Sequence, residues 1–535
     1  MATSSETSTA DQASTADQAS AAVQASAAVP ASASIRTATA TATADSAAPR
    51  ATANRSTTPV SDRFRDYIGS NWAQRDDVVP APRAQARYAA DRRSRLTARY
   101  PGKRLIIPAG RLKQRSNDTD YPFRAHSAFA YLTGWASDSE PGSVLVLEPT
   151  DSGHDATLYF RERAGRDSDE FYANPEIGEF WIGPRPSLAQ VAGDLALPTR
   201  GIAELAIVID NADDDTLLVR EADDEITATI DGLRLVNGDV ADVEAHEGDS
   251  RLAQDLSEMR LVKDDYELSE LRGAIAATAR GFDDIIRDLP RISTHNRGER
   301  LVEGVFNSRA RADGNTVGYD TIAASGPHAC ILHWTHNNGP VVPGDVILID
   351  AGVEAESYYT ADITRTLPIN GTFSDTQRLV YETVREAADA AFAIVTPGIR
   401  FREIHQAAMA VIAGRTAEWG MLPVSADEAL KADNQHHRRY MVHGTSHHLG
   451  LDVHDCAKAR REMYIDGVLE PGMTFTIEPG LYFQPDDLSV PEQFRGIGVR
   501  IEDNILVTAD GAENLSIDIP RTADDVEAWI ARLSQ

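Results

Sequence analysis

The 535-residue chain has only two cysteines, Cys330 and Cys456, and no long hydrophobic run. Two cysteines cannot build a disulfide framework, and their scarcity favours a reducing compartment. No stretch of about 18 apolar residues is present, so we expect no transmembrane helix. The opening MATSSETSTADQ lacks a basic region followed by an apolar stretch, which a secretory signal would have. These absences together predict a cytoplasmic protein.

Basic residues are also scarce relative to acidic ones. The chain has 52 Lys and Arg against 82 Asp and Glu, and its formal net charge is −30. Nucleic acids and anionic membranes attract basic surfaces, so neither is an expected partner. Charge alone does not indicate which chemistry the protein performs.

The chain is longer than one hydrophobic core normally supports, so we expect two or more domains. Residues 9–32 repeat a six-residue pattern, TADQAS TADQAS AAVQAS AAVPAS. Residues 1–60 contain few large apolar side chains, and we expect them to form a disordered tail. A weakly helical, alanine-rich segment is the alternative.

From residue 61 the pattern is that of a globular protein. The short apolar runs KRLIIPAG, SVLVLEP, ATLYF and LAIVID predict buried strands. They alternate with helical stretches such as 82–98, which predicts an α/β domain over 61–257. A long amphipathic stretch over 258–290 begins a second domain, 258–535.

The second domain has its own strands and helices. DVILIDAGV, DITRTLPI, MTFTIEP and GVRIEDNILVT predict strands, and 376–395 and 401–420 predict helices. We therefore predict that the fold class is α/β (α+β).

Four carboxylates occupy these apolar strands, namely Asp350, Asp362, Glu478 and Glu502. Each taken alone fits a turn or a cap, but four buried acids repel one another unless a cation neutralises them. Four carboxylates with a histidine match a pair of divalent metal ions. The oxygen-rich set favours Mn²⁺, with Co²⁺ or Zn²⁺ as alternatives.

Histidines concentrate in the same region, with ten of the fourteen between 328 and 454. The stretch MVHGTSHHLGLDVHD, residues 441–455, holds four of them. It is compatible with a metal site, a proton-transfer site or a histidine-rich surface strand. On a strand, neighbouring side chains point to opposite faces, so only one of His447 and His448 could reach a metal.

Three phrases, HGTSHHLGLDVHD, IEPGLYF and GIGVRIEDNILVT, resemble the Xaa-Pro aminopeptidases (aminopeptidase P). These are dinuclear metallopeptidases of the pita-bread fold, and the resemblance spans about residues 85–520. It implies an N-terminal α/β domain of the creatinase/prolidase type, followed by a C-terminal pita-bread metallopeptidase domain.

The resemblance also implies a ligand set. Asp350 would chelate one ion, Asp362 and Glu502 would bridge both, and His447 with Glu478 would hold the other. A hydroxide bridging the two ions would attack the scissile carbonyl, and Glu478 would shuttle its proton.

Further residues receive roles from the same resemblance. His333, His443 and His454 would line the active site without binding metal, and His454 would stabilise the intermediate or assist the departing nitrogen. Arg500 would pair with Asp118 of the N-terminal domain. Tyr482 would lie near the proline pocket, whereas His448 is expected to be either a packing residue or a surface imidazole.

The function implied is release of the N-terminal residue from peptides with proline in second position. A prolidase, which cleaves only dipeptides, is the nearest alternative, and an inactive binding protein on the same fold is another. The expected assembly is a homo-oligomer, a dimer or a tetramer. The native metal and the physiological peptide are left open by the sequence.

Overall fold

The computed structural model describes residues 59 and 61–534 apart from 118, 214 and 238–240, and describes only the backbone of 236, 237 and 241–245. The predicted N-terminal tail therefore lies, apart from residue 59, outside the described residues, and so does Asp118. Within the described residues, no helix has the length and apolar character needed to cross a membrane.

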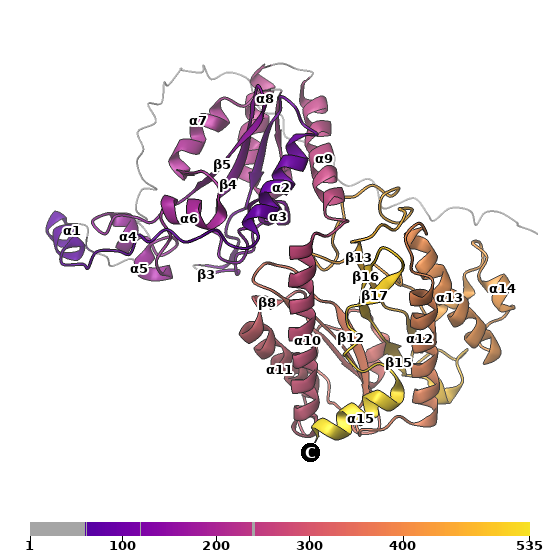
Figure 1. The fold of residues 1–535 in the computed structure, drawn as a ribbon. Coiled ribbons are helices and arrows are strands. Elements are labelled where there is room, and N and C mark those ends of the chain that lie inside the picture. Colours follow the sequence, from indigo (N-terminus) through magenta and orange to yellow (C-terminus); the bar gives the residue numbers. More distant parts are fainter. Residues whose placement is uncertain (1–58, 60, 118, 214, 238–240, 535) are drawn as a thin grey trace, which may run out of the picture. The chain divides into compact units, whose positions relative to one another are not determined.

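A five-stranded mixed sheet organises the first part of the chain (Figure 1). In spatial order it comprises β6 (Thr199–Gly201), β5 (Gly153–Phe160), β4 (Val144–Thr150), β1 (Arg104–Pro108) and β7 (Thr216–Leu218). Successive residues of β1 alternate between two cores, since Leu105 and Ile107 lie in one hydrophobic cluster and Ile106 in another. Both faces of the sheet are thus buried, which explains its continuous apolar runs.

Helices and a small hairpin complete this part. They are α1 (Asp62–Gly69), α2 (Ala86–Thr97), β2 (Gln114–Ser116), β3 (Thr119–Asp120), α3 (Ser127–Thr133), α4 (Asp169–Ala173), α5 (Glu179–Ile182), α6 (Leu188–Leu195), α7 (Leu205–Asp210), α8 (Asp224–Asn237) and α9 (Ala241–Met259). The strands predicted from KRLIIPAG, SVLVLEP and ATLYF and the helix predicted near 82–98 are confirmed.

One strand prediction was wrong. LAIVID forms the helix α7, in which Leu205 is buried but Ile207 is 66% exposed. The strand that lies beside β1 is instead β7, which pairs with β1 in parallel. A short apolar run fits a strand or a helix equally well, so the pattern alone could not decide between them.

The stretch over 258–290 contains the end of one helix and most of the next. Helix α9 ends at Met259, and α10 (Asp265–Ile292) begins after the connection formed by residues 260–264. Asp264 caps α10, because its carboxylate accepts from the backbone N–H of Glu267 while the Glu267 side chain accepts from the N–H of Asp264. This capping box fixes the start of the helix.

The second part repeats one arrangement, two helices followed by antiparallel strands. Its first half contains α10, α11 (Gly298–Asp313), β8 (Thr316–Val317), β9 (Ile322–Ser325), β10 (Val346–Ala351), β11 (Val353–Glu354) and β12 (Ile363–Pro368). Its second half contains α12 (Asp375–Ala393), α13 (Phe401–Glu418), α14 (Ala426–Ala429), β13 (Thr474–Ile477), β14 (Gly480–Tyr482), β15 (Gly498–Arg500), β16 (Asp503–Val507), β17 (Ala512–Asn514) and α15 (Ala523–Leu533). Helices α10 and α11 lie on one side of these strands and α12 and α13 on the other (Figure 1).

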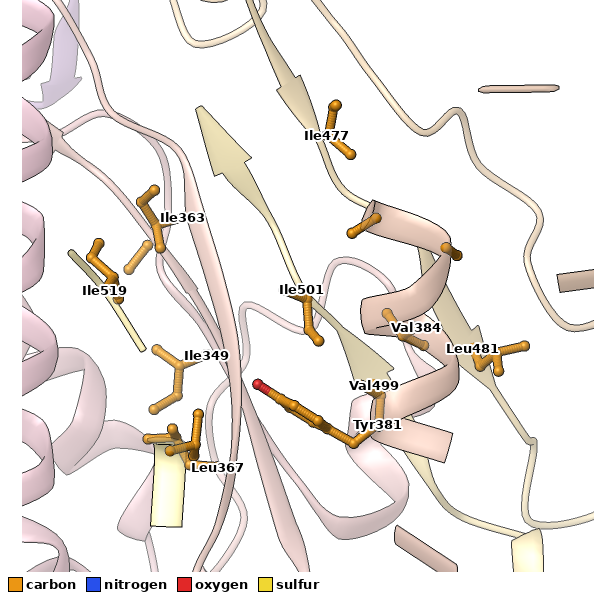
Figure 2. Packing of buried hydrophobic residues seen from close by; sticks show 14 of the residues in the cluster. Ile349, Ile363, Leu367, Tyr381, Val384, Ile477, Leu481, Val499, Ile501 and Ile519 are labelled. Carbon is orange, nitrogen blue, oxygen red and sulfur yellow. The ribbon is translucent and has the colours of Figure 1, made fainter. Parts of the chain in front are cut away.

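The strands of the two halves form separate small sheets that are joined by side chains and backbone. Strand β10 pairs with β9 and β12, β13 pairs with β16, and β14 pairs with β15. The backbone N–H of Glu502 donates to the carbonyl of Thr364 on β12, at 3.1 Å, and so links the halves. Figure 2 shows Ile349 and Ile363 from the first half in the same core as Val384 and Ile501 from the second.

Most predictions for this part are confirmed, including the helices expected at 376–395 and 401–420. The run GVRIEDNILVT, however, is not one strand. It divides into β15 and β16, with Ile501 and Glu502 between them. The interruption places Glu502 where two sheets meet.

Candidate metal centre and its surroundings

The first two acids of the site lie on neighbouring strands. Asp350 is on β10, directly opposite Thr364 of β12, and Asp362 immediately precedes β12. Both are buried, at 8% and 5% exposure. Asn504 fixes the backbone of Asp362, since its amide accepts from the Asp362 N–H and donates to the Asp362 carbonyl.

Tyr319 connects these acids, although no motif in the sequence indicates its role. Its hydroxyl oxygen lies 2.7 Å from Oδ1 of Asp350 and 2.5 Å from Oδ1 of Asp362. Gly352 permits this approach, because a Cβ there would lie 1.7 Å from the carbonyl oxygen of Ala361 and 3.1 Å from the Tyr319 ring. One hydroxyl proton cannot serve two carboxylates, so the pair needs a further proton or a cation.

The remaining ligand candidates converge on Asp362. Nε2 of His447 lies 3.2 Å from Oδ2 of Asp362 and 3.5 Å from Oε1 of Glu478. Glu502 accepts a hydrogen bond of 2.7 Å from the hydroxyl of Thr364. Donor atoms of Asp362, His447 and Glu502 all lie within 4.8 Å of one another, close enough to hold one metal ion.

Burial and mutual repulsion perturb these groups strongly. Burial, followed by the charges of Asp362, Glu478 and Asp350, raises the pKa of Glu502 well above its usual value. Burial likewise raises the pKa of Asp362 and brings the pKa of Glu478 to about 7. Burial opposes the charge on His447, but its hydrogen bond to Asp362 and the two nearby carboxylates raise its pKa to about 9. A hard divalent cation would relieve this repulsion, so the residues fit the metal site that the sequence predicted.

Arg500 lies beside the acids. Its Nη2 donates to Oδ2 of Asp350 at 2.6 Å, Nη1 donates to the Tyr482 hydroxyl at 3.0 Å, and Nε donates to Thr364 Oγ1 at 3.1 Å. The β14–β15 pairing, in which Tyr482 is opposite Gly498, brings Tyr482 to this position. The predicted partner Asp118 is outside the described residues, so that pairing stays a prediction.

His443 extends the chain of contacts through Tyr482. Its Nε2 lies 2.8 Å from the Tyr482 hydroxyl and its Nδ1 lies 2.7 Å from the carbonyl oxygen of Gly444. Burial and the Arg500 charge lower the pKa of His443 to about 3, so the ring is neutral. A carbonyl can only accept, so Nδ1–H donates to Gly444 and Nε2 accepts from the Tyr482 hydroxyl.

His454 and His333 lie on the exposed side of the site. The His454 ring meets the His447 ring edge to face, with centroids 4.3 Å apart. Partial desolvation of the ring by neighbouring residues, and then the charges of His447 and His333, lower the pKa of His454 to about 4. The structure thus brings His454 against a ligand candidate, with His333 within electrostatic reach.

His448 points away from the acids, as expected of a packing residue. It is buried and stacks on Phe401, with ring centroids 4.5 Å apart. His447 and His448 do not lie on a strand, because residues 441–455 are irregular apart from an isolated bridge between His448 and Phe475. The reversal of side-chain direction between His447 and His448 holds nonetheless.

Comparisons with known proteins agree with this geometry. The model of "Metallopeptidase family M24" matches residues 269–509, and that of "Aminopeptidase P, N-terminal domain" matches 89–199. Xaa-Pro aminopeptidase 1 of Streptomyces coelicolor is 49% identical over 474 residues, which cover 89% of this chain and 93% of the relative.

Solved structures that resemble this chain agree with the family comparisons. An aminopeptidase of Pseudomonas aeruginosa, PepP, superposes with a TM-score of 0.70 at 30% identity, covering 86% of this chain and 99% of that one. A substrate complex of an Escherichia coli aminopeptidase P variant gives a TM-score of 0.70 at 30% identity, covering 85% and 99%. The predicted fold, an N-terminal α/β domain and a C-terminal pita-bread domain, is confirmed. The chain belongs to the Xaa-Pro aminopeptidases of metallopeptidase family M24.

Proposed function

We propose that this protein removes the N-terminal residue from peptides whose second residue is proline. One observation carries the proposal. Three metal-ligand candidates, the buried Asp362 and Glu502 and the half-buried His447, lie within reach of one ion, beside the hydrogen-bonded chain His443–Tyr482. The names of the relatives, Xaa-Pro aminopeptidase and aminopeptidase P, support the same assignment.

The proposal includes two divalent ions, Mn²⁺ in preference to Co²⁺ or Zn²⁺, because the donors are mainly carboxylate oxygens. Asp350 would hold one ion, Asp362 and Glu502 would bridge both, and His447 with Glu478 would hold the other. When bound, such ions polarise a carbonyl and lower the pKa of water, so that hydrolysis can occur at neutral pH.

The protein's own residues would then bind the peptide and move protons. Glu478, whose Oε1 lies 3.5 Å from Nε2 of His447, would accept a proton from water and release it again. The neutral ring of His454 would stabilise the intermediate or assist protonation of the departing proline nitrogen, and His333 would face the substrate beside it. Arg500 holds the Tyr482 hydroxyl in place, so Tyr482 could line a pocket for the pyrrolidine ring.

Xaa-Pro specificity has a chemical reason. The bond before proline is a tertiary amide without an N–H, so selectivity needs a pocket that fits the pyrrolidine ring and a geometry suited to a tertiary amide. Removal of a single residue further requires that the free α-amine be recognised. An acetylated amine should therefore block cleavage.

The test is to offer Xaa-Pro-Yaa, its N-acetylated form, Xaa-Ala-Yaa and the dipeptide Xaa-Pro to the Mn²⁺-loaded protein. Efficient cleavage of the first alone, or of the first and last, supports the assignment. Cleavage of the dipeptide alone would make the protein a prolidase, and comparable cleavage of Xaa-Ala-Yaa would remove the proline claim. No hydrolysis of any of them would favour an inactive binding protein.

We extend the proposal to the organisation of the chain. Residues 61–257 would form the N-terminal domain, 258–535 the catalytic domain, and the assembly would be a homo-oligomer, either a dimer or a tetramer. Sedimentation equilibrium of the full chain measures the subunit number directly, and a monomer at all concentrations would contradict that part.

A further inference from the structure

The segment that joins His447 to His454 packs into the core of the N-terminal part of the chain. Leu449 and Leu451 are buried in the hydrophobic cluster that surrounds one face of the five-stranded sheet, and Val453 packs against the same cluster. The metal-site histidine and its neighbour in the site are therefore connected by residues that belong to a different core.

Asp452 is the polar anchor of this segment. The hydroxyl of Ser127, the first residue of α3, donates to Oδ1 of Asp452 at 2.5 Å, and Arg124 Nη2 lies 3.2 Å from the same oxygen. Arg124 also donates to the carbonyl oxygen of Leu451 at 2.8 Å. On the other side, Arg260 Nη2 donates to Oδ2 of Asp452 at 3.4 Å. Asp452 is thus held from two directions.

Asp455 anchors the residue on the other side of His454. Its carboxylate accepts from Arg260 Nε at 2.9 Å and from Lys263 Nζ at 3.2 Å, and its backbone N–H donates to the carbonyl of His448. Asp455 and Lys263 are fully buried, so this ion pair is shielded from solvent screening. His454 therefore stands between two fixed aspartates.

The imidazole of His454 has fewer contacts than the carboxylates of Asp452 and Asp455. Among the described residues, none forms a hydrogen bond with its ring nitrogens, and its ring contact is the edge-to-face packing on His447. Its orientation consequently depends on the backbone that Asp452 and Asp455 fix. Displacing a group by about 1 Å can cost 100-fold in rate.

We infer that Asp452 is a positioning residue for His454, through which Ser127 and Arg124 of the N-terminal part contribute to turnover. This inference rests on the proposed function, in which His454 acts on the bound peptide. It assigns to the N-terminal domain a part in catalysis besides any contact that it makes with substrate.

The experiment is a double-mutant cycle with Asp452→Ala and His454→Ala on the full Mn²⁺-loaded chain. Asp452→Ala should fold, because Arg124 keeps Glu354 at 2.8 Å and Arg260 keeps Asp455. We expect its kcat to fall by roughly 10- to 100-fold with KM little changed. In the His454→Ala background the same substitution should have no further effect, because the group it positions is gone. Equal losses in both backgrounds would overturn the inference.

Glu356→Ala is the matched control. Glu356 accepts from the hydroxyl of Ser137, so it also joins the N-terminal part to the catalytic part through a serine and a carboxylate, but it lies outside 449–456. Its kcat should equal that of the unaltered protein. A loss as large as that of Asp452→Ala would mean that any contact between the two parts supports turnover, which would overturn a specific role for Asp452.

Hydrogen exchange provides a readout that does not depend on cleavage. The backbone N–H groups of Leu449, Gly450 and Asp455 are bonded to the carbonyls of Thr474, Asp452 and His448, respectively. Peptides covering 449–456 should exchange several-fold faster in Asp452→Ala and in Ser127→Ala, while peptides covering β10 stay unchanged. Unchanged exchange in 449–456 would overturn the inference, whereas failure of the unaltered protein to cleave Xaa-Pro-Yaa would overturn only the proposed function.

Discussion

The Arg500 guanidinium and the Asp350 carboxylate form a buried ion pair 2.6 Å long, inside a site otherwise crowded with negative charge. Arg500 simultaneously fixes the Tyr482 hydroxyl and Thr364. One arginine therefore balances part of the acid cluster and orients the tyrosine beside it. Removing the Arg500 guanidinium should therefore disturb both the charge balance of the acid cluster and the orientation of Tyr482.

Arg500→Ala is expected to destabilise the metal-free protein by about 3 kcal/mol, because it leaves a buried carboxylate without its partner. Urea unfolding in the presence of a chelator measures this loss. The control is Arg439→Ala, which breaks a bidentate pair with Asp487 in which the Arg439 side chain is 59% exposed, and which should cost no more than about 1 kcal/mol. Equal losses in the two variants would contradict the assigned importance of the Arg500 pair.

Tyr319→Phe should weaken metal binding by roughly 10-fold, because the hydroxyl orients two ligand candidates, Asp350 and Asp362. Titration with Mn²⁺ against a competing chelator gives the dissociation constants. Tyr359→Phe is the matched control, since it removes a buried hydroxyl that donates to Glu267, which is outside the ligand set. If both variants bind Mn²⁺ like the unaltered protein, Tyr319 has no part in the site.

Glu502→Ala and His454→Ala should separate metal binding from catalysis. Glu502→Ala removes a carboxylate proposed to bridge both ions, so the purified protein should lose one or both of them. His454→Ala should keep both ions and lose most of its turnover of Xaa-Pro-Yaa. Metal analysis by mass spectrometry, alongside the peptide assay, decides the matter, and identical metal content in the two variants would show that the roles are wrongly assigned.

Acidification should destabilise the protein partly through His448. Burial and the nearby Lys263 charge lower the pKa of His448 to about 3 in the folded state, whereas an unfolded histidine has a pKa of about 6.5. The unfolded state therefore binds the proton first as the pH falls, and stability is lost between about pH 6.5 and pH 3.

His448→Phe should remove that contribution and keep the stacking on Phe401. Between pH 7 and pH 5 the variant should lose about 2 kcal/mol less stability than the unaltered protein, as measured by urea unfolding with a chelator present. His336→Ala, at an exposed position, should behave like the unaltered protein. If the stability of His448→Phe falls with pH as steeply as that of the unaltered protein, His448 does not contribute to the acid destabilisation.

The sequence was most informative where local pattern and chemistry coincide. Asp350 and Asp362 interrupt apolar runs, so both the strands and the anomalous acids could be read directly, and β10 and β12 followed. LAIVID misled because a short apolar run carries no information about whether a sheet has a vacant edge. The irregular backbone around His447 was missed for a related reason, since its partner Thr476 is 29 residues away.

Contacts between distant residues account for the rest. Tyr319 precedes Asp350 by 31 residues and follows no motif, so only the folded chain shows that its hydroxyl lies between two acids. Arg260 and Lys263 likewise meet Asp455 across 195 and 192 residues. Such pairs depend on how two parts of the chain pack, and periodicity within either part cannot reveal them.

Gly352 has a consequence for mutational tolerance. A side chain there would collide with the Ala361 backbone and press on Tyr319, although Gly352 itself has no chemical group to offer a substrate or an ion. In a saturation library selected for activity, position 352 should therefore be as depleted of variants as the proposed ligands. Depletion in such a library would identify the residues that the site requires, both those that react and those whose smallness lets the reacting groups meet.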